Sequence, residues 1–271
     1  ISITQILSQD EGKNNIAKGI ARDYPKYEVR AGMLDVARTY IPMDYLKEMT
    51  IYMAYYKLNE VQVHVNDYWG ATGYSAFRLE STTYPMITST DGSYTKEEYK
   101  NYQKEMKNYG IDVITEIDTP YHAECFRSIP GVKMLKTGAL DIREQSSYDI
   151  IENLIDEYLD GDDPVIESDK FHIGTDEYDK TYSEQMRKWT DHFIKYVNNK
   201  GYKTRLWGSL GSRGFNGTTP VSNDATVNLW APYWADVKET YASGYDIINT
   251  CGGWLYIVPG ANAGYPDRLN I

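Results

Sequence analysis

Asp176 and Glu177 place two carboxylic acids side by side, directly after a short apolar run that ends in Gly174. Two neighbouring carboxylates repel each other, so one is expected to stay protonated near neutral pH while the other ionises. This division suits a reaction in which one acid protonates a leaving oxygen and the other stabilises positive charge. A solvated acidic turn is the alternative, but the preceding strand and a glycine that allows a tight turn favour a reactive pair.

The adjacency of the two acids limits the mechanism that they could support. A retaining glycosidase with two carboxylates holds its acid and its nucleophile about 5–5.5 Å apart across the glycosidic bond. Residues adjacent in sequence cannot easily flank a sugar from opposite faces. The nucleophile is therefore expected to belong to the substrate, as the acetamido oxygen of an N-acetyl sugar.

Polar and aromatic residues also end most of the other predicted strands. They are Arg30 and Asp35, His64 to Asp67, Glu116 to His122, His172 to Glu177, Trp207, Trp230 and Tyr256. The carboxyl ends of parallel barrel strands meet at one face, where active sites of such barrels lie. The pattern predicts a funnel lined with carboxylates, imidazoles and aromatic rings.

The elements that must position these residues alternate between short β-branched runs and amphipathic segments, a pattern typical of parallel sheets. Seven strands are predicted, over residues 29–35, 61–65, 111–117, 171–174, 204–207, 227–230 and 247–250. Helices are predicted over about 43–56, from Thr95 with a capping box to Glu98, and over 147–159, 183–200 and 235–243. Residues 66–93 are interpreted as a long polar loop. Without a G-x-G-x-x-G motif, the pattern favours an α/β fold of the (β/α)8 TIM type over a dinucleotide-binding sheet.

Residues 255–258 could be an eighth strand, but they follow the seventh too closely to leave room for a helix. We interpret them as the prolonged end of the seventh strand, so the barrel is expected to lack its last βα unit. The domain division predicted is a lead-in segment over 1–26 and a catalytic barrel, incomplete at its C-terminal end, over 27–271.

Composition excludes several classes of protein. The 271 residues carry a formal net charge of −11, which argues against a sequence-independent grip on nucleic acid phosphates. The sequence contains no apolar run of the ~18–20 residues that a membrane-spanning helix needs, so no membrane insertion is expected. Cys125 and Cys251 are too few for a disulfide framework or a four-thiolate zinc site. The sequence leaves the oligomeric state open.

Four motifs together resemble glycoside hydrolase family 20, the β-N-acetylhexosaminidases and lacto-N-biosidases. His172 to Glu177 is similar to the signature H-x-G-x-D-E of that family. The other three, in the order of the family, are R-x-x-M-L-D from Arg30, H-x-x-D from His64 and E-I-D-x-P-x-H from Glu116. The resemblance covers about residues 27–258 and implies a TIM barrel with substrate-assisted catalysis.

The resemblance also implies a role for each residue of the predicted site. Glu177 would be the general acid and then the general base, and Asp176 would accept the acetamido N–H. Tyr256 would hydrogen-bond the acetamido oxygen, while Trp207 and Trp230 would enclose the acetamido methyl group. The remaining predicted site residues would bind the sugar or support the acid. Arg30 would bind sugar hydroxyl groups, and Asp118 and His122 would form a polar relay near Glu177. Asp67 would help to hold the sugar or the residues that support it.

One departure from the family bears on the substrate. Exo-acting hexosaminidases of this family usually carry Tyr-x-Asp at the seventh strand, where this chain has Tyr256, Ile257 and Val258. Loss of that carboxylate is expected to open the pocket to a second sugar, and residues 74–81 look similar to lacto-N-biosidases. We therefore expect release of lacto-N-biose, galactosyl-β-1,3-N-acetylglucosamine, from non-reducing ends, with release of terminal GlcNAc or GalNAc as the alternative.

A non-catalytic carbohydrate-binding barrel is the alternative from another class, although a lectin has no use for an acid catalyst. A metal-dependent hydrolase would need a ligand motif such as H-E-x-x-H, which the sequence does not contain, so no metal and no cofactor are expected. The expected partner is an oligosaccharide with a β-linked N-acetylhexosamine. Because such glycans are usually met outside the cell, we expect an extracellular or cell-surface location.

Overall fold

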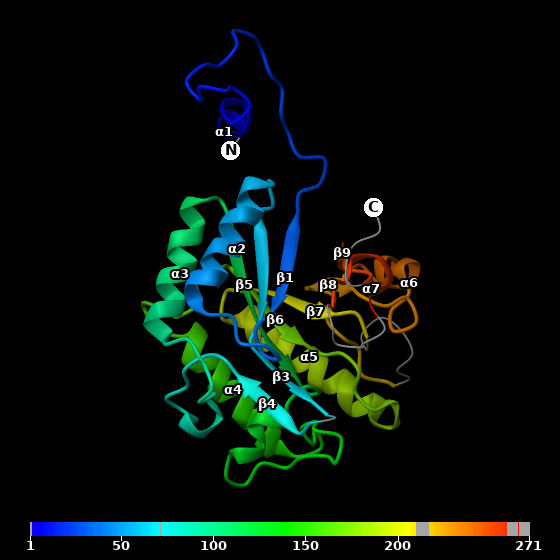
Figure 1. Cartoon of the computed structure of the whole chain (residues 1–271). Coiled ribbons are helices and arrows are strands. Elements are labelled where there is room, and N and C mark those ends of the chain that lie inside the picture. Colours follow the sequence, from blue (N-terminus) through cyan, green and yellow to red (C-terminus); the bar gives the residue numbers. More distant parts are fainter. Residues whose placement is uncertain (1, 71, 210–216, 259–264, 266–271) are drawn as a thin grey trace.

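The computed structural model describes residues 2–70, 72–209, 217–258 and 265. Its centre is a seven-stranded sheet in which every neighbouring pair is parallel and the order β1-β2-β5-β6-β7-β8-β9 follows the chain (Figure 1). The strands are β1 (Ala31–Asp35), β2 (Glu60–His64), β5 (Asp112–Thr119), β6 (Lys170–Gly174), β7 (Lys203–Trp207), β8 (Thr226–Leu229) and β9 (Asp246–Asn249). Within the described ranges β1 and β9 form the two edges of the sheet. The predicted α/β class and the seven strands of an incomplete barrel are confirmed.

Helices connect the strands and cover the outer face of the sheet (Figure 1). They are α2 (Met43–Tyr55), α3 (Lys96–Asn108), α4 (Gln145–Leu159), α5 (Ser183–Asn199) and α6 (Val237–Ala242). The predicted start of α3 is confirmed, because the Thr95 side chain accepts a hydrogen bond from the backbone N–H of Glu98. No helix in the described ranges combines the length and the apolarity needed to cross a membrane.

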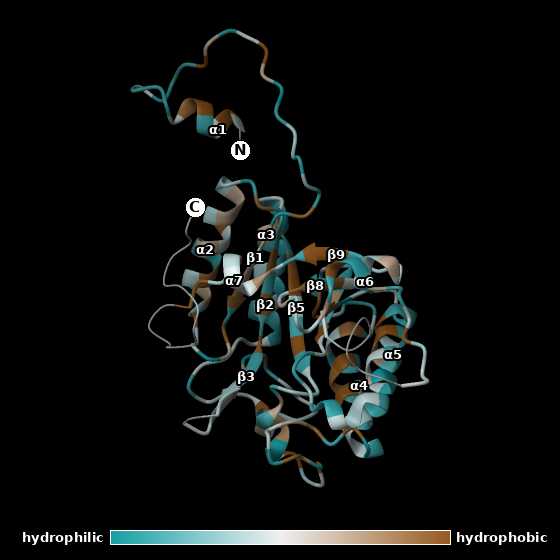
Figure 2. Ribbon diagram, turned by 90° about the vertical axis from the view of Figure 1, so that its right-hand side faces the viewer, coloured by the Kyte–Doolittle hydropathy of each residue, from teal (hydrophilic) through white to brown (hydrophobic). Residues whose placement is uncertain are grey.

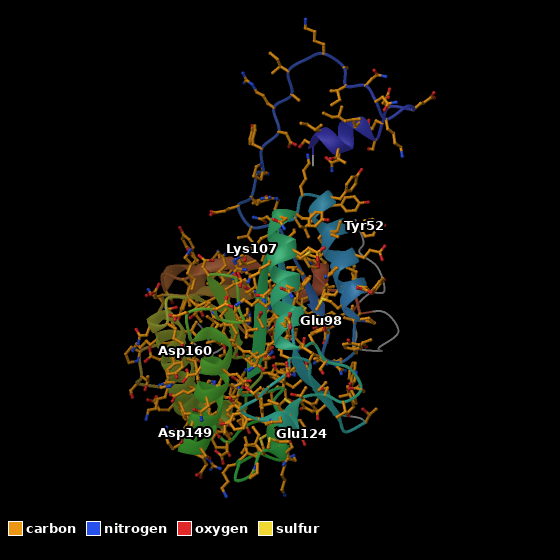
Figure 3. The ribbon with its side chains drawn as sticks, turned by 90° about the vertical axis from the view of Figure 1, so that its left-hand side faces the viewer. Tyr52, Glu98, Lys107, Glu124, Asp149 and Asp160 are labelled. Atoms are coloured by element: carbon orange, nitrogen blue, oxygen red, sulfur yellow. The ribbon has the colours of Figure 1, made fainter. Side chains whose placement is uncertain are left out.

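The longer covering helices bury one face, which is mostly apolar. In α4 the apolar stripe consists of Ile150, Ile151, Leu154, Ile155 and Tyr158, at the spacing of one helical face. Figure 2 shows brown apolar segments in the strands and mixed colours in α4 and α5. The side of the helices that faces away from the sheet is turned to the viewer in Figure 3. The side chains labelled there are mostly charged.

The polar segment after β2 is more ordered than the sequence indicated. Residues predicted as loop form an antiparallel hairpin of β3 (Asn66–Trp69) and β4 (Tyr74–Phe77), followed by the short 3-10 helix η1 (Pro85–Ile87). Arg78, directly after β4, is fully buried and donates to the carbonyl oxygens of Val36 and Ala37. The hairpin is thereby fixed to the chain that leaves β1.

The expectation for residues 255–258 is wrong. Residues Gly252–Leu255 form the helical turn α7, and residues 256–258 belong to no strand. The turn begins at two glycines, Gly252 and Gly253, which do not favour extended pairing. At the other end, α1 (Ser2–Leu7) and the segment that follows it lie near the amino-terminal ends of the strands (Figure 1).

The inner face of the sheet is polar. In β2, Val61 and Val63 belong to the apolar core beneath the helices, so the alternate residues point into the barrel. Glu60 meets the guanidinium of Arg205 from β7 in two hydrogen bonds of 2.7 and 3.0 Å, and both residues are buried. Charged pairs and amides therefore fill an interior that branched apolar residues usually dominate.

Candidate active site

The turn after β6 presents the two predicted acids at the carboxyl ends of the strands. Gly174 has a φ of +74°, and a Cβ atom there would lie 2.7 Å from the Cα atom of Asp118. Thr175 and Glu177 also have positive φ values, of 79° and 49°. Residues other than glycine rarely adopt this region, and such residues tend to cluster at functional sites. The glycine is needed here for both its conformation and its lack of a side chain.

The turn separates the two acids into different environments. The Asp176 side chain is 12% exposed, whereas the Glu177 side chain is 38% exposed. Burial raises the pKa of Asp176 to about 7, and the negative charge of Glu177 adds to that effect while His122 opposes it. Adjacent acids with unequal surroundings are the arrangement predicted from the sequence.

His122 connects Glu177 to the interior. Its Nε2 lies 3.2 Å from Glu177 Oε2 and 3.6 Å from Asp176 Oδ1, and its Nδ1 lies 2.8 Å from Asp67 Oδ1. Burial alone would lower the pKa of His122, but its acidic neighbours, Asp67 first among them, outweigh burial and hold that pKa well above its ordinary value. His122 is therefore an imidazolium that donates from both ring nitrogens. The relay to Glu177 passes through Asp67 rather than Asp118.

Asp67 is a buried carboxylate with four donors. Its Oδ1 accepts from His122 and from the backbone N–H of Tyr68 at 2.6 Å. Its Oδ2 receives His64 Nε2 at 2.6 Å and an Arg38 guanidinium nitrogen at 2.7 Å. Although burial raises the pKa of Asp67, its charged histidine neighbours hold that pKa far below its usual range. Asp67 is therefore ionised at neutral pH.

Asp118 lies beside Asp176 at the end of β5. Burial and the neighbouring Asp176 charge raise the pKa of Asp118 well above its ordinary value, so Asp118 is protonated. Asn66 fixes this corner, because its amide donates to the carbonyl oxygens of Asp118 and His122 and accepts the Asp118 N–H. Sequence reasoning placed Asn66 only in a polar strand end, without this bridging role.

Aromatic side chains form a cluster beside the two acids. Trp207 and Trp230 are buried, and Trp234 and Tyr256 pack against them. The rings of Trp230 and Trp234 are stacked with centroids 6.2 Å apart. Burial and the Asp176 charge raise the pKa of Tyr256, so its hydroxyl remains a donor. The structure brings together the three predicted aromatic residues, and it adds Trp234, which the sequence analysis did not single out.

Arg30 is not brought to this cluster. It precedes β1, and its guanidinium donates to the carbonyl oxygens of Tyr27, Glu28 and Lys57. Arg38 is a cation that does reach the site, where it binds Asp67. The sequence analysis missed Arg38, although its position shortly after the carboxyl end of β1 was a signal that could have found it.

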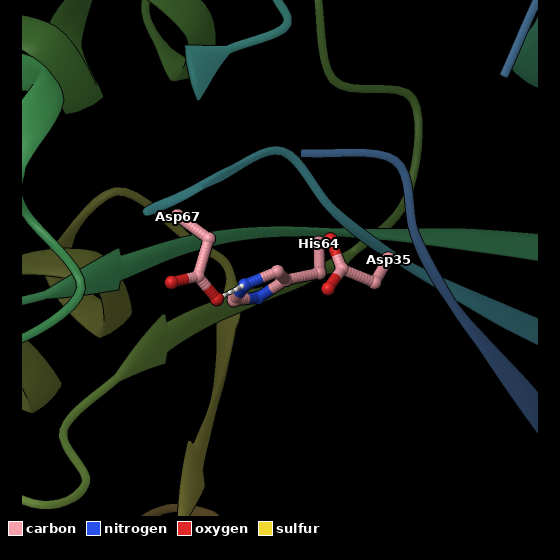
Figure 4. A group of neighbouring side chains, drawn as sticks. All are labelled: Asp35, His64 and Asp67. Atoms are coloured by element: carbon pink, nitrogen blue, oxygen red, sulfur yellow. Dashed lines mark hydrogen bonds and ion pairs between the residues drawn. The ribbon is translucent and has the colours of Figure 1, made fainter. Parts of the chain in front are cut away.

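Some of these groups have the types of atom that bind metal ions. Three sets have ligand atoms within 4.8 Å of one another: Asp35, His64 and Asp67; His64, Glu116 and Asp118; and Asp118, His122 and Asp176. Figure 4 shows the first set, in which His64 points its ring toward Asp67. Asp35 already accepts from the backbone N–H groups of Ala37 and Arg38 and from the Arg38 guanidinium. A cation in this first set would have to displace Arg38, so the residues fit an ion-pair network better than a metal site.

The chain is similar to known proteins in sequence and in fold. The model of the catalytic domain of glycosyl hydrolase family 20 matches residues 27–189. Beta-hexosaminidase 1 of Coccidioides posadasii is 24% identical to this chain over 92% of the chain and 48% of its own length. The lacto-N-biosidase of Bifidobacterium bifidum is 25% identical over 92% of this chain and 23% of its own length. The crystal structure of beta-N-acetylhexosaminidase from Bacteroides fragilis superposes with a TM-score of 0.74 at 21% identity, covering 90% of this chain and 54% of that one.

The chain thus spans about half, or less, of the length of these relatives. The two curated relatives match it at nearly the same identity, so similarity alone does not favour lacto-N-biosidases over β-hexosaminidases. The family match, by contrast, covers more than half of the chain and contains all four motifs in full, including the acids Asp176 and Glu177. The chain belongs to glycosyl hydrolase family 20.

Proposed function

We propose that this chain carries the catalytic site of a retaining glycosidase that removes terminal β-linked N-acetylhexosamine with the help of the substrate's own acetamido group. The observation that carries the proposal is the pair formed by buried Asp176 and exposed Glu177 beside a cluster of indole rings. Only Glu177 of the two is open enough to reach a leaving group, while Asp176 faces the enclosed part of the site.

In the first step the acetamido oxygen attacks the anomeric carbon and the glycosidic C–O bond breaks. Glu177 gives its proton to the departing oxygen, and the N–H of the oxazolinium ion that forms donates to Asp176. The developing positive charge favours the ionised form of Asp176, which has a pKa of about 7 without substrate. Holding the internal nucleophile close to its attack position is worth several kcal/mol.

In the second step the Glu177 carboxylate takes a proton from a water molecule, whose oxygen attacks the anomeric carbon. The C–O bond of the oxazolinium ring breaks, and the acetamido group is restored with the anomeric configuration retained. His122 donates toward Glu177 from 3.2 Å and so stabilises the carboxylate that exists between the steps.

The other residues have supporting roles in the proposal. Tyr256 donates to the acetamido oxygen, and Trp207 and Trp230 enclose its methyl group away from water. Arg38, whose side chain is 28% exposed, is better placed to meet sugar hydroxyl groups than Arg30. The role predicted for Arg30 in sugar binding stays a prediction.

The experiment is hydrolysis of 4-nitrophenyl β-N-acetylglucosaminide by the wild type and by Glu177→Gln, with the anomer of the first product read by proton NMR. We expect the product to be released first as the β-anomer. We also expect a thiazoline that mimics the oxazolinium ion to inhibit the reaction. Product released first as the α-anomer, or full activity of Glu177→Gln, would overturn the proposal. Binding of the sugar without hydrolysis by the wild type would instead favour the carbohydrate-binding barrel.

Release of lacto-N-biose is a second candidate, favoured by the residues after Tyr256. Ile257 is 48% exposed and Val258 follows it, so this stretch presents no carboxylate to grip the outer hydroxyls of a terminal sugar. Aryl β-lacto-N-bioside offered beside aryl β-N-acetylglucosaminide separates the two candidates. Fast cleavage of the monosaccharide substrate alone would exclude lacto-N-biose release. In either case an extracellular glycan remains the proposed substrate, and an extracellular or cell-surface location remains a proposal.

A further inference from the structure

Glu116 is a fully buried carboxylate on the inner face of β5. Its Oε1 accepts from the indole Nε1 of Trp207 at 2.6 Å, and its Oε2 accepts from the Gln62 amide at 2.7 Å. Gln62 in turn accepts from the Asn228 amide at 3.0 Å. This one carboxylate therefore links residues from four strands and holds the orientation of an indole that lines the site.

The same carboxylate is the inner end of a chain of alternating charges. Glu116 Oε1 lies 3.0 Å from His64 Nδ1, an ion pair rather than an aligned hydrogen bond. His64 Nε2 lies 2.6 Å from Asp67, and Asp67 lies 2.8 Å from His122. His122 then reaches Glu177 at 3.2 Å. Every member except Glu177 is buried, so water does not screen these contacts.

We propose, on the basis of the function proposed above, that Glu116 is a positioning residue of the reaction. With one carboxylate it holds Trp207 against the acetamido group and, through His64, Asp67 and His122, keeps the acid Glu177 in place. Glu116 touches no substrate, and it acts at both ends of the site through other residues.

The charges around Glu116 support this role. The titratable groups that interact with Glu116 are His64 from β2, Asp118 from β5 itself, His172 and Asp176 from β6 and its end, and Tyr256 after α7. Burial raises the pKa of Glu116, but His64, together with smaller contributions from its other neighbours, outweighs burial and lowers the pKa to about 2. His172 is neutral, because burial lowers its pKa to about 4 and its Nδ1 accepts the Gly174 N–H.

Glu60 offers a matched control within the same barrel. It is also a buried inner carboxylate, but it pairs with Arg205 near the amino-terminal ends of the strands and has no contact with the site. Any general cost of removing a buried charge should therefore affect Glu60→Gln as well. A role specific to the site should affect Glu116→Gln alone.

The first measurement is kcat/KM on two aryl β-N-acetylglucosaminides. The 2,4-dinitrophenyl leaving group needs little protonation, whereas the 4-nitrophenyl group depends more on the acid. We expect Glu116→Gln to lower kcat/KM about 100-fold on the 4-nitrophenyl substrate and about tenfold on the dinitrophenyl substrate. Glu60→Gln should leave the substrate ratio, kcat/KM on the dinitrophenyl substrate divided by kcat/KM on the 4-nitrophenyl substrate, at its wild-type value.

The second measurement is the protonation state of the histidines, read from ¹⁵N-histidine NMR at pH 7 in a His192→Gln background. The wild-type chain should show His64 and His122 as imidazolium and His172 as neutral. Glu116→Gln should convert His64 to its neutral form, and Glu116→Asp should restore the imidazolium, although its shorter side chain is not expected to reach Trp207.

The outcomes separate the two proposals. Wild-type chain that cleaves neither glycoside would refute the proposed function, while the NMR comparison still tests the link from Glu116 to His64. An unchanged substrate ratio in Glu116→Gln, or a His64 that stays charged in that variant, would overturn the role of Glu116. If Glu116→Gln fails to fold, Glu116→Asp decides the question. Because its shorter side chain releases Trp207, its kcat/KM should fall below that of Glu60→Gln on both substrates, and a value equal to that of Glu60→Gln would overturn the role of Glu116.

Discussion

Asp176→Asn should stabilise the fold, and increasingly so as pH rises. In the folded chain the pKa of Asp176 is raised from 3.8 to about 7 because the carboxyl group is buried. Between these values the folded state binds more protons than the unfolded state, so ionisation of Asp176 costs stability as pH rises. Asparagine keeps the shape of the protonated side chain and carries no charge, so the variant avoids that cost.

The structure gives the size of the effect. The pKa of Asp176 shifts from 3.8 to about 7, and each pKa unit is worth about 1.36 kcal/mol. Asp176→Asn should therefore raise the free energy of unfolding by about 4 kcal/mol at pH 8. At pH 4 the expected difference falls below about 1 kcal/mol, because the carboxyl group is then largely protonated in the folded chain and near its midpoint in the unfolded chain. These are upper values, since the protonation of Asp176 is linked to that of Asp118 and His122.

The assay is urea denaturation of the wild type and Asp176→Asn at pH 4, 6 and 8, with the free energies of unfolding compared at each pH. Glu157→Gln is a control of opposite sign. Lys96, Ser81 and nearby backbone N–H groups overcome burial and lower the pKa of Glu157 to about 2, so this substitution should destabilise the chain most at high pH. Parallel curves of stability against pH for the wild type and Asp176→Asn would refute the reasoning.

Three further outcomes are expected. Glu177→Gln should lower kcat/KM on 4-nitrophenyl β-N-acetylglucosaminide by about 10²–10⁴-fold with an unchanged circular dichroism spectrum, because only proton transfer is lost; a smaller effect would assign the acid elsewhere. Tyr256→Phe should lower kcat about 100-fold with little change in KM, measured on the same substrate, because a donor to the developing oxazolinium oxygen is removed. Gly174→Ala should destabilise the fold by more than about 2 kcal/mol in urea denaturation, since its φ is +74° and its Cβ would collide with Asp118. A stable, active Gly174→Ala protein would contradict the close packing of β5 and β6.

Much of the fold could be predicted because its strands and helices follow simple periodicities. The apolar stripe of α4 and the N-cap at Thr95 are local signals, and both helices appear where they were expected. The hairpin of β3 and β4 was missed because its strands are only four residues each, and tyrosine, serine and glycine made the segment look like a loop. Residues 255–258 were interpreted as the end of a strand because Ile257 and Val258 are β-branched, and β-branched pairs are typical of strands. The sequence does not show whether a pairing partner is present.

The site was predictable in composition but less so in its connections. Asp176, Glu177 and the aromatic residues stand at strand ends, and strand order alone brings such ends together. The partner of His122 depends on which side chains point into the barrel, a choice that the sequence does not state. Asp67 rather than Asp118 is that partner, and Arg38 rather than Arg30 supplies the cation. Inward polar residues such as Gln62 were not singled out, because one amide within a strand carries no local signal of its partners.

The backbone of Thr175 restricts how this protein could be made more resistant to heat. A β-branched residue at a φ of 79° stores on the order of 1–3 kcal/mol, which a glycine at that position would release. A screen that selects only for a higher melting temperature should therefore return substitutions of Thr175. The same substitutions would loosen the turn that keeps one acid enclosed and its neighbour open, so the most stable variants from such a screen should be among the slowest catalysts.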